Sequence, residues 1–254
     1  MNAHPDPLKK IDVIEKLGAQ IPLDQVFIDH LGQEITLSKL QKDGKPTLLT
    51  FVYYRCPMLC TFVLNTLADS LNKLPKWLPG HDYNLVTISI NPEEGPEVAL
   101  EKRNNYLSTF DNPAFKGEKL NWHFWTSPDN QVKQLAQSVG FQYYYDKSIE
   151  EYAHPAVVFL LTSDGMLSRN IYGLTYPTQD IRLGLLEASK GKMGSALEKV
   201  LLYCYRYDPD RGSYVLFAAN AMKVAGLLTI VLLGSFLAAM WHFEKRKTKG
   251  DARA

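Results

Sequence analysis

The chain has 254 residues, enough for one sizeable core with appendages or for two small domains. Its composition, 46% hydrophobic and 22% charged, is typical of a folded protein. A net charge of +1 argues against a nucleic-acid partner, because it creates no global attraction to phosphate. Three cysteines are too few for a disulfide scaffold, so the close pair Cys56 and Cys60 indicates redox or metal chemistry.

The first third of the chain predicts a hairpin, a strand and a helix. Residues 1–20 form a polar lead-in, and short β-rich pieces in residues 21–50, broken at Gly32, predict a small hairpin. The apolar run TLLTFVYY (47–54) predicts a buried strand. A helix is expected to begin near Cys56 and Pro57, since proline is favoured at the first helical position. Its apolar residues at helical spacing are Leu59, Phe62, Val63, Leu67 and Leu71.

Strands and helices then alternate along the chain. We expect strands at 84–90 and 120–127, helices at 97–110 and 129–140, two strands within 154–173 joined at Ser163–Gly165, and a last helix at 178–190. This order predicts an α/β fold, with a mixed sheet covered on both faces, in a domain spanning residues 21–190. Residues 191–220, which include Cys204, are expected to form a connector in which Cys204 is a packing residue.

The C-terminal part predicts a membrane anchor. Val224–Trp241 is an uncharged run of 18 residues, and residues 221–243 match the roughly 20 residues that cross a bilayer. The basic tail, 244–254, predicts a cytoplasmic C-terminus and places the preceding domain in the periplasm, at the inner membrane. The N-terminus shows no apolar signal segment, although a periplasmic domain must be exported. Either a signal peptide has been removed or misannotated upstream, or this orientation is wrong.

The spacing of Cys56 and Cys60 allows two kinds of chemistry. On successive turns of a helix, their Cβ atoms would lie roughly 5–6 Å apart, more than the about 3.5–4.5 Å of a disulfide. The pair can therefore form a disulfide only if Cys56 lies in the turn before the helix. Near a helix N-terminus the thiolate form is stabilised, and thiolates bind metals and attack disulfides.

Two thiolates favour a soft metal. Copper(I), zinc and iron–sulfur clusters are candidates, but a cluster requires more cysteines than lie nearby. Two sulfurs and one imidazole would suit copper in either oxidation state or a three-ligand zinc site. Among the six histidines, His154 stands out, because it lies just before Pro155 at the start of a predicted buried strand and follows an acidic loop, residues 146–151.

Three segments, considered together, resemble the Sco/SenC family of copper proteins. They are TLLTFVYYRCPMLC (47–60), TISINPEEGPEVALEKRNNYL (87–107) and YAHPAVVFLLTSDGMLSRNIYG (152–173). The resemblance covers residues 20–190 and implies a thioredoxin-like fold in which Cys56, Cys60 and His154 bind copper, as Cu(I) or Cu(II). It also implies that Cys56 and Cys60 are a redox-active pair able to form a disulfide.

The same resemblance implies a role and partners. The role is that of a metallochaperone, or a thiol reductant, in the assembly of the binuclear copper centre of cytochrome c oxidase. The implied partners are the membrane, the oxidase subunit that carries this copper site, and a copper donor or thiol reductase. No nucleic acid is expected. A C-terminal anchor marks a variant of the family, in which many members are anchored at the N-terminus.

The sequence departs from the family pattern beside the predicted site. Asn91 stands where the family usually has aspartate, and Glu93 or Glu94 could take over that carboxylate's role. We predict that Pro155 lies beside the cysteine pair, as a proline does in thioredoxins, with a cis peptide bond as an option. The tyrosines expected to line the rim near His154 are Tyr143, Tyr144, Tyr145 and Tyr152.

Two other functions are compatible with these residues. One is a thiol–disulfide oxidoreductase of the thioredoxin or peroxiredoxin kind that uses Cys56 and Cys60, although thioredoxin-like reductases normally have two residues between the cysteines. The other is a membrane-anchored binding module with a vestigial metal site, which the presence of Asn91 would permit. A copper chaperone is not an enzyme in the sense of turnover.

Overall fold

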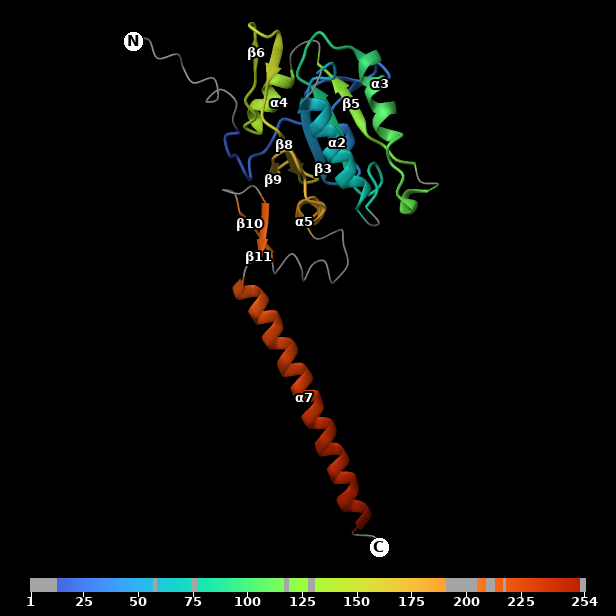
Figure 1. Ribbon diagram of the computed structural model, residues 1–254, viewed down its shortest axis with the longest axis vertical. Helices are drawn as coiled ribbons and strands as arrows, with labels where there is room; N and C mark the ends of the chain where they lie inside the picture. The colour runs from blue at the N-terminus through green and yellow to red at the C-terminus, as the bar shows by residue number, and fades with distance from the viewer. Residues whose placement is uncertain are drawn as a thin grey trace, which may run out of the picture.

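The fold is organised around one mixed sheet, seen in a computed structural model (Figure 1). The structure describes residues 13–56, 59–74, 77–116, 119–127, 131–190, 205–208, 213–216 and 218–251. The strands of the sheet are β1 (Phe27–Asp29), β2 (Glu34–Ile35), β3 (Thr47–Val52), β4 (Asn84–Ser89), β5 (His123–Thr126), β8 (Val157–Leu161) and β9 (Leu167–Tyr172). The helices of this domain are α1 (Leu37–Gln41), α2 (Leu59–Asn72), α3 (Pro96–Leu107), α4 (Val132–Ser138) and α5 (Thr178–Ala188), with a short 3-10 turn at Pro113–Phe115.

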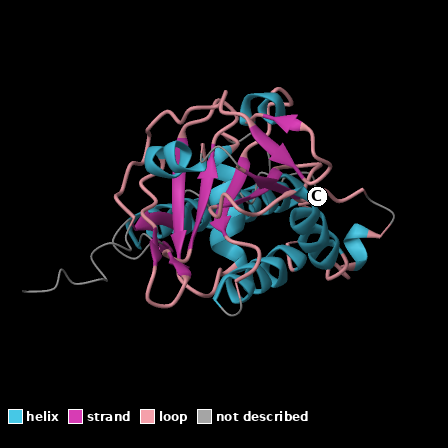
Figure 2. Cartoon of the chain, turned by 90° about the horizontal axis from the view of Figure 1, so that it is seen from above, coloured by secondary structure: helices cyan, strands magenta, loops and turns pink. Residues whose placement is uncertain are grey.

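The seven strands lie in the order β2-β1-β5-β4-β3-β8-β9. The three central strands β5, β4 and β3 are parallel, while β8, β9, β1 and β2 pair antiparallel with their neighbours. Every residue of β3 and β4 is buried, as expected for central strands with both faces covered. Figure 2 shows helices on both sides of the strands. The predicted α/β fold with a mixed, doubly covered sheet is confirmed.

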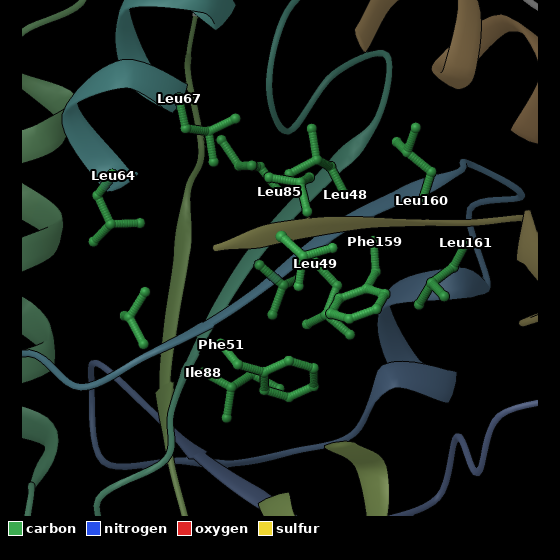
Figure 3. Close-up of a cluster of buried hydrophobic side chains, with 14 of the residues drawn as sticks. Leu48, Leu49, Phe51, Leu64, Leu67, Leu85, Ile88, Phe159, Leu160 and Leu161 are labelled. Carbon is green, nitrogen blue, oxygen red and sulfur yellow. The ribbon is translucent and has the colours of Figure 1, made fainter. Parts of the chain in front are cut away.

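The core lies on both faces of the sheet, because successive residues of a strand point to opposite faces. Phe51 of β3 and Phe159 of β8 meet Phe141, three residues after the end of α4, with ring centroids 5.0 and 6.0 Å from it. On the other face, Phe124 of β5 stacks on Tyr106 of α3 at 6.0 Å. Figure 3 shows leucines of α2 and of β3, β4 and β8 in this core. Helix α5 also lies on the face of α3, and a Cβ at its Gly184 would come within 2.2 Å of Leu160.

The turn signals in the sequence mark the ends of elements correctly. Gly140 has a φ of +80° and follows the last turn of α4, where a left-handed residue ends the helix. β8 and β9 form the antiparallel hairpin predicted around Ser163–Gly165, and Gly165 has a φ of +82°. The small N-terminal hairpin is also confirmed, as β1 and β2.

Two local features go beyond what the sequence predicted. Phe62 lies on the outer side of α2 and is 46% exposed, because the core-facing positions of this helix are Val63, Leu67 and Leu71. The acidic loop expected at residues 146–151 forms the turn, with the adjoining strand ends, of a second antiparallel hairpin that was not predicted, formed by β6 (Tyr144–Asp146) and β7 (Glu151–Ala153). Tyrosines lie in both of its strands, as expected for a residue that favours strands.

A long helix leads away from the domain (Figure 1). Helix α7 (Ala218–Asp251) follows a small hairpin of β10 (Tyr205–Asp208) and β11 (Ser213–Leu216). Its segment Met222–Met240 is apolar enough to cross a membrane, and none of it is buried in the protein. The helix extends beyond both ends of the span expected from the sequence. Cys204 and most of the connector lie outside the described residues.

Candidate metal centre

Cys56 lies at the end of a tight turn that follows β3. Its N–H donates to the carbonyl of Tyr53 at 3.4 Å, so Tyr54 and Arg55 are the central residues of a β-turn. Only 7% of Cys56 is exposed. The cysteine therefore precedes the described part of α2, which is the placement that a disulfide with Cys60 would require.

Cys60 is the second residue of α2 as the structure describes it. Its side chain lies outside the described part, as do Pro57 and Met58, where the helix was expected to begin. Within the described residues, no group of three His, Cys, Asp or Glu side chains could hold a metal. The pairing of the two sulfurs and the three-ligand set consequently stay predictions.

His154 lies in the segment between β7 and β8, and β8 is the sheet neighbour of β3. It is buried, with 7% of its surface exposed, and its Nδ1 lies 3.0 Å from the carbonyl oxygen of Pro155. A carbonyl only accepts, so Nδ1 must donate, and the neutral ring carries its lone pair on Nε2. Burial lowers the pKa of His154, which keeps the imidazole in the neutral form that binds metals.

Cys56 also acts on the pKa of His154. A Cys56 thiolate acts to raise the pKa of His154, as does the Pro155 carbonyl, although burial outweighs both. The strand pairing explains this proximity, because β3 leads into Cys56 and β8, which pairs with β3, begins three residues after His154. Thus the structure brings together two of the three predicted ligands, although they are 98 positions apart in the sequence.

Pro155 lies beside this site but takes the trans form. No peptide bond is cis in the part of the chain that the structure describes. The cis option raised by the comparison with thioredoxins is therefore wrong. The role of Pro155 seen here is to offer its carbonyl to the His154 ring.

Tyr53 and Phe141 contact the ring of His154, and the tyrosines expected at the rim lie one contact further out. Tyr53 meets His154 edge-on, with ring centroids 6.3 Å apart, and also packs against Tyr152 at 5.7 Å. Tyr143 and Tyr145 contact Tyr152 in turn. Two cavities of about 590 Å³ each adjoin this cluster and share Tyr145 and Tyr152. Tyr143 and Tyr144 line the first, while the second is lined by Arg55, Asn91, Glu93, Glu150 and Glu151 among others.

The two glutamates proposed to replace the missing aspartate have different positions. Glu93 lines the second cavity with Asn91. Glu94 is buried, and its carboxylate accepts hydrogen bonds from the N–H groups of Tyr54 and Arg55, both at 2.7 Å. Sequence reasoning missed this contact. Its only sequence signal was a glutamate just before the Gly95–Pro96 start of a helix.

Residues 17–183 match the model of the SCO1/SenC family. The chain belongs to the SCO1/SenC family. This match covers the whole sheet and both elements that carry Cys56 and His154. No curated protein sequence matches the chain.

Solved structures place this SCO1/SenC protein among thioredoxin-like folds. It is similar to a putative electron transfer protein from Aquifex aeolicus VF5, with a TM-score of 0.58 and 23% identity over 69% of this chain and 95% of that one. BsSco, described as a member of the Sco family of cytochrome c oxidase assembly proteins, has a TM-score of 0.54 and 21% identity over 70% and 99%. Copper-bound ScoI of Arabidopsis thaliana has a TM-score of 0.50 and 22% identity over 69% and 99%.

Proposed function

We propose that this SCO1/SenC protein is a membrane-anchored metallochaperone that binds copper through Cys56, Cys60 and His154. Its role is the assembly of the binuclear copper centre of cytochrome c oxidase, and its partner is the oxidase subunit that carries this centre. Its other partner is a copper donor protein or a thiol reductase. Copper is the cargo of the protein in this proposal.

The observation that carries the proposal is the placement of Cys56 and His154 at the same end of two paired strands, Cys56 just after β3 and His154 just before β8. A buried thiol and a buried imidazole with its lone pair on Nε2 form a soft donor pair. Cys60, four residues further along the chain, supplies the third donor. Two solved relatives support this choice of metal and pathway, one crystallised with copper bound and the other named as an oxidase assembly protein.

The C-terminal helix supplies the anchor in this proposal. Met222–Met240 spans the hydrocarbon core, and the cations that follow Trp241 remain on the cytoplasmic side. The thioredoxin-like domain then faces the periplasm at the inner membrane. That is the side on which a protein with this orientation meets the recipient subunit.

A copper titration of the reduced full chain in detergent tests the ligand set. We expect one Cu(I) per chain in competition with a chromophoric chelator. His154→Ala should weaken binding by more than the about 10- to 100-fold that loss of an outer-shell contact costs. Cys56→Ser or Cys60→Ser should abolish tight binding, while His81→Ala, at an exposed histidine, should leave the affinity unchanged.

The outcomes separate the two functions that use these cysteines. Equal affinity of wild type and His154→Ala would contradict the three-ligand site. Turnover of a disulfide substrate that depends on both cysteines, with no copper uptake by the wild type, would favour the thiol–disulfide oxidoreductase instead.

A further inference from the structure

The turn that presents Cys56 is built around one buried carboxylate. Tyr54 and Arg55 are the central residues of this turn, and Glu94 binds the N–H groups of both. Oε2 accepts from Tyr54 and Oε1 from Arg55, each at 2.7 Å. Glu94 thus holds the two residues immediately before the cysteine from a distant segment, the loop between β4 and α3.

Glu94 is 2% exposed, and hydrogen bonds compensate its charge. A third donor, the hydroxyl of Ser89 at the end of β4, lies 2.5 Å from Oε2. Within the described residues, no Lys, Arg or His forms an ion pair with Glu94. A buried carboxylate without a cation is stable only where several donors meet it, and an ionised carboxylate accepts at both oxygens. The site is therefore constructed for a carboxylate.

The contact with Glu94 lies directly before Cys56. Strand β3 ends at Val52, whose carbonyl accepts from the N–H of Ile90, and the chain then leaves the sheet for the turn that ends at Cys56. The hydrogen bond that closes the turn, from Cys56 N–H to Tyr53 carbonyl, is 3.4 Å long, much longer than the two bonds to Glu94. The shorter, charge-assisted bonds are the stronger ones.

We infer that Glu94 is a positioning residue of the copper site, whose carboxylate fixes the Tyr53–Cys56 turn so that the Cys56 sulfur is held toward His154. This inference rests on the proposed function, since it concerns the same site. Glu94 does not touch copper. It acts through the backbone, in the way that outer-shell groups orient the ligands of other metal centres.

The test replaces the carboxylate by an amide of the same shape. Glu94→Gln keeps the shape of the side chain, but its amide nitrogen is a donor and would face a backbone N–H. We expect the Cu(I) affinity of the full chain in detergent to fall about 10- to 100-fold. The thiolate-to-Cu(II) charge-transfer absorption should shift, and the copper-free protein should show faster alkylation of Cys56 in a Cys60→Ser background.

Two further variants complete the series. Glu101→Gln removes an exposed carboxylate from α3 and should leave both readouts at wild-type values. Glu94→Asp keeps the charge but is one methylene shorter, so it should give an affinity between those of wild type and Glu94→Gln. If Glu94→Gln does not fold, the decision rests on Glu94→Asp, and wild-type affinity in that variant would overturn the inference.

The readouts distinguish this inference from the proposed function. If folded Glu94→Gln binds copper as wild type does and Cys56 reacts at an unchanged rate, Glu94 has no positioning role. If wild type binds no copper but Glu94→Gln still speeds the alkylation of Cys56, the positioning role holds and the copper proposal fails.

Discussion

At the scale of single residues, a second histidine has a defined protonation state. His123, at the start of β5, lies with its Nε2 2.9 Å from the amide nitrogen of Asn121, whose oxygen accepts from Arg103 at 3.2 Å. Because Arg103 only donates, it fixes the orientation of the Asn121 amide, and Nε2 of His123 must be the acceptor. Burial, with His30 and Arg103 nearby, lowers the pKa of His123 to about 4, although Asp29 opposes the shift.

This histidine predicts a pH dependence of stability. The unfolded state binds the proton between pH 6.5 and about 4 whereas the folded state does not, so the free energy of unfolding falls as pH is lowered through this window. A shift from 6.5 to about 4 corresponds to roughly 3 kcal/mol, fully present above pH 6.5. The buried His30, whose pKa is also lowered, adds to the same trend.

Denaturant unfolding between pH 4 and 7 measures this effect. His123→Gln should flatten the pH dependence, while His81→Gln, at an exposed histidine, should keep it. A His123→Gln profile that coincides with that of wild type would show that His123 is protonated alike in the folded and unfolded states.

The sequence singles out residues with distinctive chemistry but not the residues that support them. Cys56 follows from its spacing to Cys60, and His154 from its place before a strand in a family pattern. Glu94 could not be predicted in its role, because its partners are backbone N–H groups 39 and 40 positions away, which leave no trace in side-chain identity.

At the scale of elements, the end of α4 is fixed by one glycine. Gly140 has a φ of +80°, and its carbonyl accepts from Ile14 N–H at 2.9 Å, which attaches the N-terminal segment to this turn. A Cβ on Gly140 would lie 1.9 Å from the carbonyl oxygen of Ile14. The turn therefore requires glycine both for its backbone angle and for the close approach of a neighbouring chain segment.

Gly140→Ala should be more damaging than alanine at an open left-handed glycine. We expect the free energy of unfolding to fall by about 2–4 kcal/mol, from the strained backbone and the clash together. Gly44→Ala is the matched control, since Gly44 has a φ of +68° with nothing within 4 Å of its added Cβ, and it should cost about 1–2 kcal/mol. Equal losses in denaturant unfolding would contradict the contact with Ile14.

Strands were predicted well where the run of apolar residues was long and poorly where the strand was short. The buried runs of β3 and β4 and the hairpin of β8 and β9 are confirmed. The β6–β7 hairpin was missed, because a three-residue strand is too short for apolar and polar residues to alternate recognisably. Pairing between the two strands stabilises this hairpin, and the sequence does not show that pairing.

At the scale of the whole molecule, the domain and the long helix differ in how far their apolar side chains are exposed. The domain buries most of its large apolar residues, whereas α7 exposes an apolar surface over Met222–Met240. The exposed large residues of this helix are Met222, Leu227, Leu228, Ile230, Val231, Leu232, Leu233, Phe236, Leu237 and Met240. A continuous apolar surface of this kind is covered by lipid in an anchored protein.

Membrane fractionation tests the anchor. The full chain should remain in the membrane after alkaline carbonate extraction, and a variant that lacks residues 218–254 should be found in the soluble fraction. Recovery of the full chain in the soluble fraction would contradict a transmembrane role for α7.

X-ray absorption at the copper edge of the Cu(I)-loaded full chain measures the proposed ligand set most directly. We expect two sulfur neighbours and one nitrogen neighbour, with the nitrogen lost in His154→Ala and one sulfur lost in Cys56→Ser. A copper environment without sulfur, or one that His154→Ala leaves unchanged, would contradict the assignment of copper to Cys56, Cys60 and His154.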